Sequence, residues 1–280
     1  MRGKRVWAGI AIVVGLAAIS VIVGNAVYAG PKVHVGRTCG EPNRPSLDQV
    51  DHAGFDALLR KHVDDQGMVS YAAWKASAAD MQALDDYLAR LGCVDQTKQT
   101  SAKGKLVFWI NAYNAVTIKG ILREYPTTSI RNHTAKLGYN IWKDLLLIVD
   151  GKGFSLDDME HSILRKMGEP RIHFAIVCAS KGCPPLLNQA YTAAKLDEQL
   201  ASNARKFFAE PINLQVDGAR RNVGISSLIK WYGGDFTQSA QAQIQQLKPY
   251  FPNADQLGWI DQGGLTYRYL DYDWSLNEKR

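Results

Sequence analysis

The stretch FWINAYNAVTIKGIL, residues 108–122, decides the fold of this chain. It is apolar almost all round, and a helix that is hydrophobic on every face lies buried in a core. The helical pattern extends from about Lys103 to Arg123 and ends before Pro126. We therefore predict one long buried helix here.

Segments on both sides of this helix carry helix and strand patterns. Apolar spacing predicts further helices near residues 55–62, 81–91, 155–167, 196–209 and 238–247. Short apolar or alternating runs predict strands over 145–149, 171–178 and 265–272, and a hairpin that joins 213–216 to 222–225. Helices and antiparallel pairs are interspersed without regular alternation, so we expect an α+β domain and not a doubly wound sheet.

The N-terminus has the pattern of a segment that directs export. Three basic residues among the first five precede an uncharged run from Val6 to Ala29. A run of this length suffices to cross a bilayer, which takes roughly 20 residues. A cleaved signal peptide and an uncleaved membrane-anchor helix both fit it, and in both cases the remainder is delivered outside. We expect a periplasmic or otherwise extracytoplasmic protein, anchored to the inner membrane through residues 6–29 if these are kept.

Composition indicates one domain after this segment. Residues 30–45 are rich in Pro and Gly and read as a linker, and residues 46–280 read as a single domain large enough to bury a core. Half of the formal net charge of +6 belongs to the first five residues. Nucleic-acid binding needs a clustered stripe of Lys and Arg, which the rest of the chain lacks, so we expect no nucleic-acid partner.

Three segments concentrate reactive side chains in apolar surroundings: FWINAYNAVTIKGIL at 108–122, SLDDMEHSIL at 155–164 and RIHFAIVCASKGCPPL at 171–186. Together with WYGGDF at 231–236 and YDWSLN at 272–277, they resemble the family catalogued as domain of unknown function 547, from about residue 50 to the end. The resemblance implies a fold similar to papain-like and NlpC-type cysteine peptidases, with a mixed, largely antiparallel sheet and packed helices. It implies a reactive set at Glu160, His161 and Cys178, and no settled substrate.

The residues themselves support the same set by their chemistry. A thiol becomes a nucleophile as thiolate, so Cys178 needs a base, and His161 is the candidate. Glu160 points about 100° away from His161 on a helix, so we expect it to anchor the site or to pair with Arg171 or Lys143. Asn111 or Asn114 could orient the imidazole or donate to an oxyanion.

Each of these residues also has a structural interpretation. Cys178 could be a small buried hydrophobe, His161 a satisfied buried histidine, and the two asparagines could pair buried backbone groups. We expect His173 to be structural. A C-terminal aromatic group is expected in the core and on the surface, or alternatively along a peptide or glycan groove: Tyr267, Tyr269, Tyr272 and Trp274.

The cysteines separate the possible functions. An even number in an exported protein suggests disulfides, and the four are Cys39, Cys93, Cys178 and Cys183. A bond between Cys39 and Cys93 would attach the linker to the first helices, whereas one between Cys178 and Cys183 would abolish thiol catalysis. A redox switch at Cys178 and Cys183 is a further alternative, although Cys-x-x-Cys spacing is absent.

Two functions follow. The first is a thiol hydrolase or transferase that acts on peptide-like amides in the cell envelope. The alternative is a non-catalytic module that binds a peptide, a glycan or a partner protein in a peptidase-like cleft. We expect no cofactor and no metal, because the sequence has no P-loop, no Rossmann Gly-rich turn and no His-Glu-x-x-His, and the group His161, His173, Cys178 and Cys183 lacks zinc-site spacing.

Overall fold

The computed structural model describes residues 31–134 and 139–279. The expected N-terminal hydrophobic helix lies outside the described residues. Within those two ranges, no helix combines the length and the apolar character needed to span a membrane.

The long helix α5, Ala102–Glu124, forms the centre of the molecule and confirms the first prediction. It begins at Ser101, whose hydroxyl accepts the N–H of Gly104 at 3.0 Å. Its middle is buried on all sides, from Leu106 through Ile118. The rest of the first lobe packs around this helix.

The first lobe combines helices with a small sheet. Its helices besides α5 are α2 (Ala53–His62), α3 (Tyr71–Ala76), α4 (Ala78–Gly92) and α6 (Ile141–Asp144). Its sheet has the order β1-β2-β3, from Val33–Val35, Leu145–Val149 and Lys152–Ser155. Strand β1 pairs in parallel with β2, and β2 pairs antiparallel with β3. Because β1 falls within the segment expected to be a linker, part of that segment belongs to the fold.

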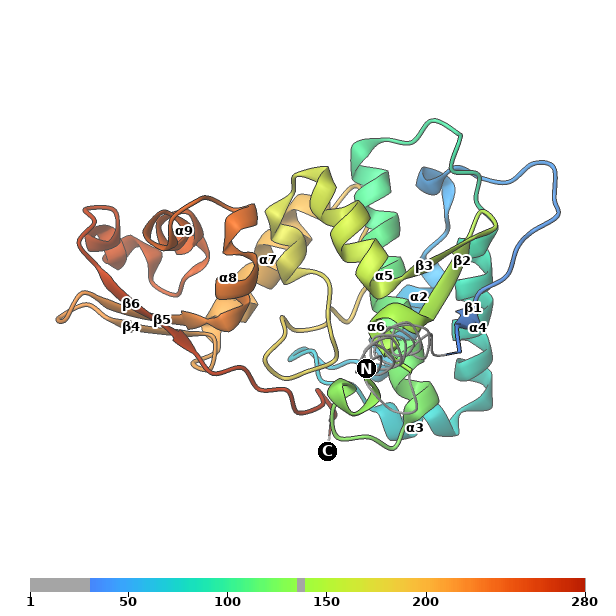
Figure 1. Ribbon diagram of the computed structural model, residues 1–280, viewed down its shortest axis with the longest axis horizontal. Helices are drawn as coiled ribbons and strands as arrows, with labels where there is room; N and C mark the ends of the chain where they lie inside the picture. Colours follow the sequence, from blue (N-terminus) through green and yellow to red (C-terminus); the bar gives the residue numbers. More distant parts are fainter. Residues whose placement is uncertain (1–30, 135–138, 280) are drawn as a thin grey trace, which may run out of the picture.

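The second lobe has its own sheet and its own core. Its sheet has the order β4-β5-β6, from Leu214–Asp217, Asn222–Ser226 and Thr266–Leu270. The helices beside it are α7 (Leu196–Ala209), α8 (Ser227–Tyr232) and α9 (Ala240–Leu247). Phe174, Phe207 and Phe208 join these elements in a hydrophobic cluster separate from the first. Figure 1 shows the two lobes side by side, with α7 between them.

The α+β class is confirmed, but the sheets differ from the expected one. Each is small and mixed, with one antiparallel and one parallel pair, in place of one largely antiparallel sheet. The parallel pairs arise because β1 and β6 reach their neighbours from distant parts of the chain. The pairs β2-β3 and β4-β5 are joined by short hairpin turns, and such turns connect antiparallel strands.

The predicted strand over residues 171–178 is wrong. Pro170–Phe174 forms a short 3-10 helix, η5, and the chain then runs without regular structure to Cys178. Glu169 accepts the N–H of Arg171 and Pro170 takes the first helical position, so the segment starts as a helix. The backbone beyond η5 finds its partners in a side-chain amide of α5, described below, and needs no neighbouring strand.

The predicted capped helix after Ser155 begins as expected. Ser155 Oγ accepts the N–H of Asp158 at 3.1 Å, and the Asp158 carboxylate accepts the N–H of Ser155 at 2.9 Å. The helix then winds as a π-helix over Asp158–Leu164, η3. Such π-helical turns often occur at functional sites, and η3 carries Glu160 and His161.

Candidate functional site

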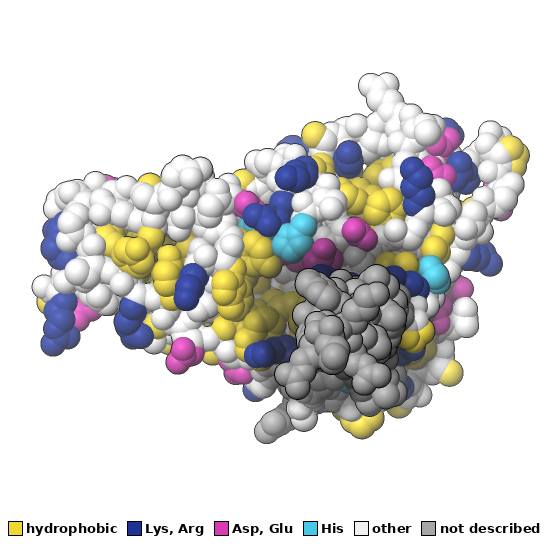
Figure 2. All heavy atoms as spheres, in the orientation of Figure 1, with side chains coloured by type: hydrophobic (Ala, Val, Ile, Leu, Met, Phe, Trp, Pro, Cys, Tyr) yellow, Lys and Arg dark blue, Asp and Glu magenta, His cyan; other side chains and the backbone are white. Residues whose placement is uncertain are grey.

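A cavity of about 320 Å³ lies where the two lobes meet. Its walls come from α5, α6, η3, the chain from His173 to Cys183, α8 and the C-terminal residues 272–274. In Figure 2, hydrophobic side chains gather along the junction of the lobes, with a histidine and charged side chains beside them. We call this cavity the cleft. Its lining includes Tyr113, Trp142, Lys143, Asp157, Glu160, His161, His173, Cys178, Cys183, Trp231, Tyr232, Tyr272 and Trp274.

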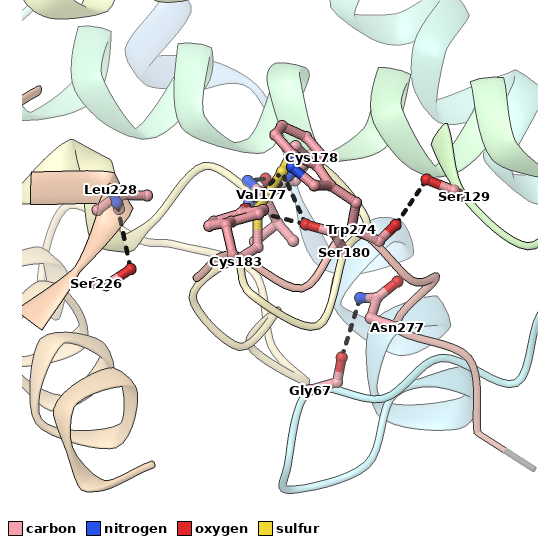
Figure 3. Close-up of a disulfide and its surroundings, with 12 residues drawn as sticks. Gly67, Ser129, Val177, Cys178, Ser180, Cys183, Ser226, Leu228, Trp274 and Asn277 are labelled. Atoms are coloured by element: carbon pink, nitrogen blue, oxygen red, sulfur yellow. Dashed lines mark hydrogen bonds between the residues drawn. A yellow bond between two sulfur atoms is a disulfide. The ribbon is translucent and has the colours of Figure 1, made fainter. Parts of the chain in front are cut away.

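A disulfide between Cys178 and Cys183 forms part of the cleft wall. Figure 3 shows it beside Val177, Ser180 and Trp274. The hydroxyl of Tyr272 lies 3.2 Å from the Cys178 sulfur and 3.1 Å from the Cys183 sulfur. The structure therefore places the predicted nucleophile in a cavity, but with its sulfur bonded.

His161 lies in the same cleft, partly exposed. Its Nδ1 is 3.1 Å from a guanidinium nitrogen of Arg165, and its Nε2 is 3.9 Å from a carboxylate oxygen of Asp157. A guanidinium only donates, so Nδ1 accepts and the ring proton is assigned to Nε2. In this arrangement neither ring nitrogen is free to take a proton from Cys178.

Glu160 is buried, and a neutral donor holds its carboxylate. Tyr113 OH donates to it at 3.1 Å, and the hydroxyl of Tyr232 lies close enough for the Glu160 charge to raise the Tyr232 pKa. Burial, and next the Glu160 charge, raise the pKa of both tyrosines, so both hydroxyls stay protonated and remain donors. Glu160 is therefore a buried carboxylate at the cleft whose hydrogen-bond partner among the described residues, Tyr113, is uncharged, while Arg165 acts on it through its charge alone. Arg171 pairs with Glu169 and Asp197 and not with Glu160.

His173 belongs to a network that the sequence did not reveal. Its Nε2 lies 2.8 Å from Asp235 Oδ2, and Arg165 donates to both oxygens of Asp235 at 2.6 and 2.7 Å. The hydrogen bonds from Arg165, and to a smaller extent the one from His173, lower the pKa of Asp235 to about 2, although burial by itself raises it. Burial lowers the pKa of His173, whose ring stacks on Tyr232 at 4.3 Å between centroids. We call Arg165, Asp235 and His173 the clamp.

The two asparagines of α5 pair with backbone and do not line the cleft. Asn111 donates to the carbonyl of Tyr191 and accepts its N–H, both at 2.9 Å. Asn114 donates to the carbonyl of Ala175 and accepts the N–H of Val177, also both at 2.9 Å. Asn114 thus holds the segment that leads directly to Cys178.

Aromatic rings form one rim of the cleft. The ring centroids of Trp231, Tyr272 and Trp274 lie 4.6 to 5.8 Å apart. Trp231 is 46% exposed, although it is among the largest apolar side chains. Arg131 lies over Trp274, with its guanidinium carbon 5.2 Å from the ring centroid. This rim offers stacking surface to a ligand.

The other two cysteines are free thiols in the structure. Burial, and next a hydrogen bond with Cys39, raise the pKa of the Cys93 thiol to about 11. The two thiols are therefore neighbours, and a disulfide between them stays a prediction.

Residues 97–208 match a family model described as "Protein of unknown function, DUF547", so this part of the chain is a DUF547 domain. The match contains α5, η3 and the disulfide, whereas α8, Asp235 and the C-terminal aromatics lie beyond it. No curated protein and no solved structure matches the chain. The function is therefore argued from the cleft itself.

Proposed function

We propose that this chain is a binding module of the cell envelope, whose cleft holds an amine-bearing group of a peptide-like ligand. The observation that carries the proposal is Glu160, a buried carboxylate at an aromatic cleft whose hydrogen-bond partner among the described residues is the uncharged Tyr113. Burying a charge without an opposite charge is costly, so such groups mark functional sites. Arg165 acts on Glu160 through its charge, but its hydrogen bonds go to Asp235. A ligand cation would supply the charged hydrogen-bond partner that Glu160 lacks among the described residues.

The surroundings of Glu160 suit an ammonium group. The rings of Tyr113, Tyr232 and Tyr272 line the same cleft, and aromatic faces attract cations. The nearby Arg165 is already engaged by both oxygens of Asp235. The cavity volume, at the low end of small-ligand sites, fits one side chain or chain terminus, and the aromatic rim would contact the rest of the ligand.

Binding of a lysine tripeptide by the full-length protein tests this proposal. We expect the lysine tripeptide to bind at least roughly tenfold more tightly than its norleucine counterpart, by calorimetry. Glu160→Gln should remove this preference. The matched control is Glu198→Gln, which changes an exposed carboxylate on α7 and should leave the preference intact. Equal affinities for the two tripeptides in the unaltered protein would refute the ammonium site.

A thiol hydrolase or transferase acting on peptide-like amides is the second candidate. It is favoured by the presence of Cys178 and His161 in one cleft, and it includes the papain-like fold that the family resemblance implies. This function requires the disulfide to be reduced, and His161 to turn from Arg165 so that a nitrogen can accept a proton.

Labelling of the reduced protein tests the hydrolase. Iodoacetamide near neutral pH should modify Cys178 first, and His161→Ala should slow that modification by roughly 100-fold or more, the range typical of a lost general base. Peptide mapping by mass spectrometry reports the modified residue. If Cys178 labels no faster than Cys39 and is indifferent to His161→Ala, Cys178 is not an activated nucleophile.

A further inference from the structure

The two sulfurs of the Cys178–Cys183 disulfide differ in access. Both cysteines line the cleft, but Cys178 is partly exposed, whereas Cys183 is only 7% exposed. An incoming thiolate must approach along the line of the S–S bond and attack one sulfur while the other leaves. Access from the cleft favours attack on Cys178.

Hydrogen bonds favour the same direction. The Cys183 sulfur accepts the backbone N–H of Cys178 at 3.0 Å, a donor that the Cys178 sulfur does not share. The hydroxyl of Tyr272 lies near both sulfurs, 3.1 Å from Cys183 and 3.2 Å from Cys178, and Ser180 Oγ lies 3.3 Å from Cys178. Burial raises the pKa of Tyr272, so its hydroxyl stays protonated and can donate to a developing thiolate. Donors that stabilise a thiolate lower its pKa and make it a better leaving group.

The loop around the disulfide has supports besides the bond. Lys181 N–H donates to the carbonyl of Ser275, and Gly182 N–H donates to the carbonyl of Asp273, both at 2.9 Å. On the other side, Asn114 holds the N–H of Val177. Opening the bond therefore leaves these anchors of the loop in place.

We propose that Cys178–Cys183 is a thiol–disulfide exchange site, at which a thiolate of a dithiol partner attacks Cys178 and Cys183 departs as the thiolate. The S–S bond breaks, its electron pair stays on Cys183, and a mixed disulfide joins the partner to Cys178. The partner's second thiolate then attacks its own sulfur in the mixed disulfide and releases Cys178 as a thiolate. The partner is oxidised to a disulfide, the two cysteines are reduced, and solvent protonates their sulfurs. The exchange uses neither Glu160 nor an amine ligand, so it stands independently of the binding function.

Brief exposure of the oxidised full-length protein to glutathione tests the direction of attack. The reaction is quenched with acid, free thiols are alkylated, and the peptides are mapped by mass spectrometry. We expect glutathione on Cys178 in at least tenfold excess over Cys183. Glutathione mainly on Cys183 would overturn the proposal, and so would a bond that dithiothreitol cannot open until the protein unfolds. These outcomes come from the unaltered protein and need no variant to fold.

The variant Tyr272→Phe tests the role of the hydroxyl. Loss of this donor should slow opening by dithiothreitol by several-fold and should raise the pKa of the Cys183 thiol in the reduced protein, followed by thiolate absorbance in the ultraviolet. The matched control is Tyr267→Phe, on the exposed face of β6, which should change neither reading. An unchanged pKa of Cys183 in Tyr272→Phe would show that Tyr272 does not stabilise the Cys183 thiolate. An unchanged rate of opening by dithiothreitol would count against Cys183 as the leaving group.

Discussion

Replacing Asp235 by alanine is expected to lower the free energy of unfolding by about 2 kcal/mol. Loss of one partner from a buried pair costs about 3–5 kcal/mol, and we discount this because the Asp235 side chain is 24% exposed. The variant leaves Arg165 without its two-fold contact and leaves the buried Nε2 of His173 without its partner. Urea unfolding, followed by circular dichroism, measures the change.

A surface ion pair provides the control. Asp85 on α4 pairs with Lys119 and is 46% exposed, so Asp85→Ala should cost at most about 1 kcal/mol. The two substitutions remove the same chemical group, and they differ in burial and in the number of partners. If both variants lose the same free energy, the clamp contributes no more than an ordinary surface pair.

The pH dependence of the unfolding free energy tests the role of Asp235 independently. The folded pKa of Asp235, about 2, lies below its ordinary value of about 3.9. The stabilisation from its charge is therefore fully present above about pH 4 and is lost as the pH falls towards 2. The free-energy difference between the unaltered protein and Asp235→Ala should shrink over that interval. A difference that stays constant from pH 5 to 2 would show that the carboxylate is not held as described.

The sequence predicted correctly those helices and strands that are determined by neighbouring residues in the chain. The all-apolar run of α5 and the apolar run of β2 were correct, and the turn at Asp217-Gly218 correctly located the hairpin of β4 and β5. The strand predicted over 171–178 failed because its alternation does not reveal where the backbone bonds go. Those bonds go to Asn114, more than 60 residues earlier in the chain.

The candidate site was predicted where its residues cluster in sequence. Glu160, His161, Cys178 and Cys183 all line the cleft, and all lie in the two reactive segments 155–164 and 171–186. Asp235 lies far from both segments in sequence, and Arg165 and His173 connect it to the site. Its motif, WYGGDF, contributed to the family resemblance, but no spacing rule connects that motif to a histidine 62 residues away.

Replacing Asn114 by alanine is expected to lower the free energy of unfolding by about 3 kcal/mol. The change leaves the carbonyl of Ala175 and the N–H of Val177 without their buried partner, and each unsatisfied group costs about 1–3 kcal/mol. It should also loosen the segment before Cys178. Hydrogen exchange at the Val177 amide should therefore accelerate well beyond the effect of the lower global stability, because the local hydrogen bond is gone.

Asn111→Ala separates loss of stability from disruption of the cleft. Asn111 lies one helical turn earlier, makes two backbone hydrogen bonds of the same length and is equally buried, but its partner is Tyr191. We expect a similar loss of unfolding free energy in this variant, without the selective acceleration at Val177. Equal acceleration at Val177 in both variants would mean that α5 supports the cleft only through general stability. Acceleration confined to Asn114→Ala would show that a single buried amide, in place of a neighbouring strand, positions the chain that carries Cys178.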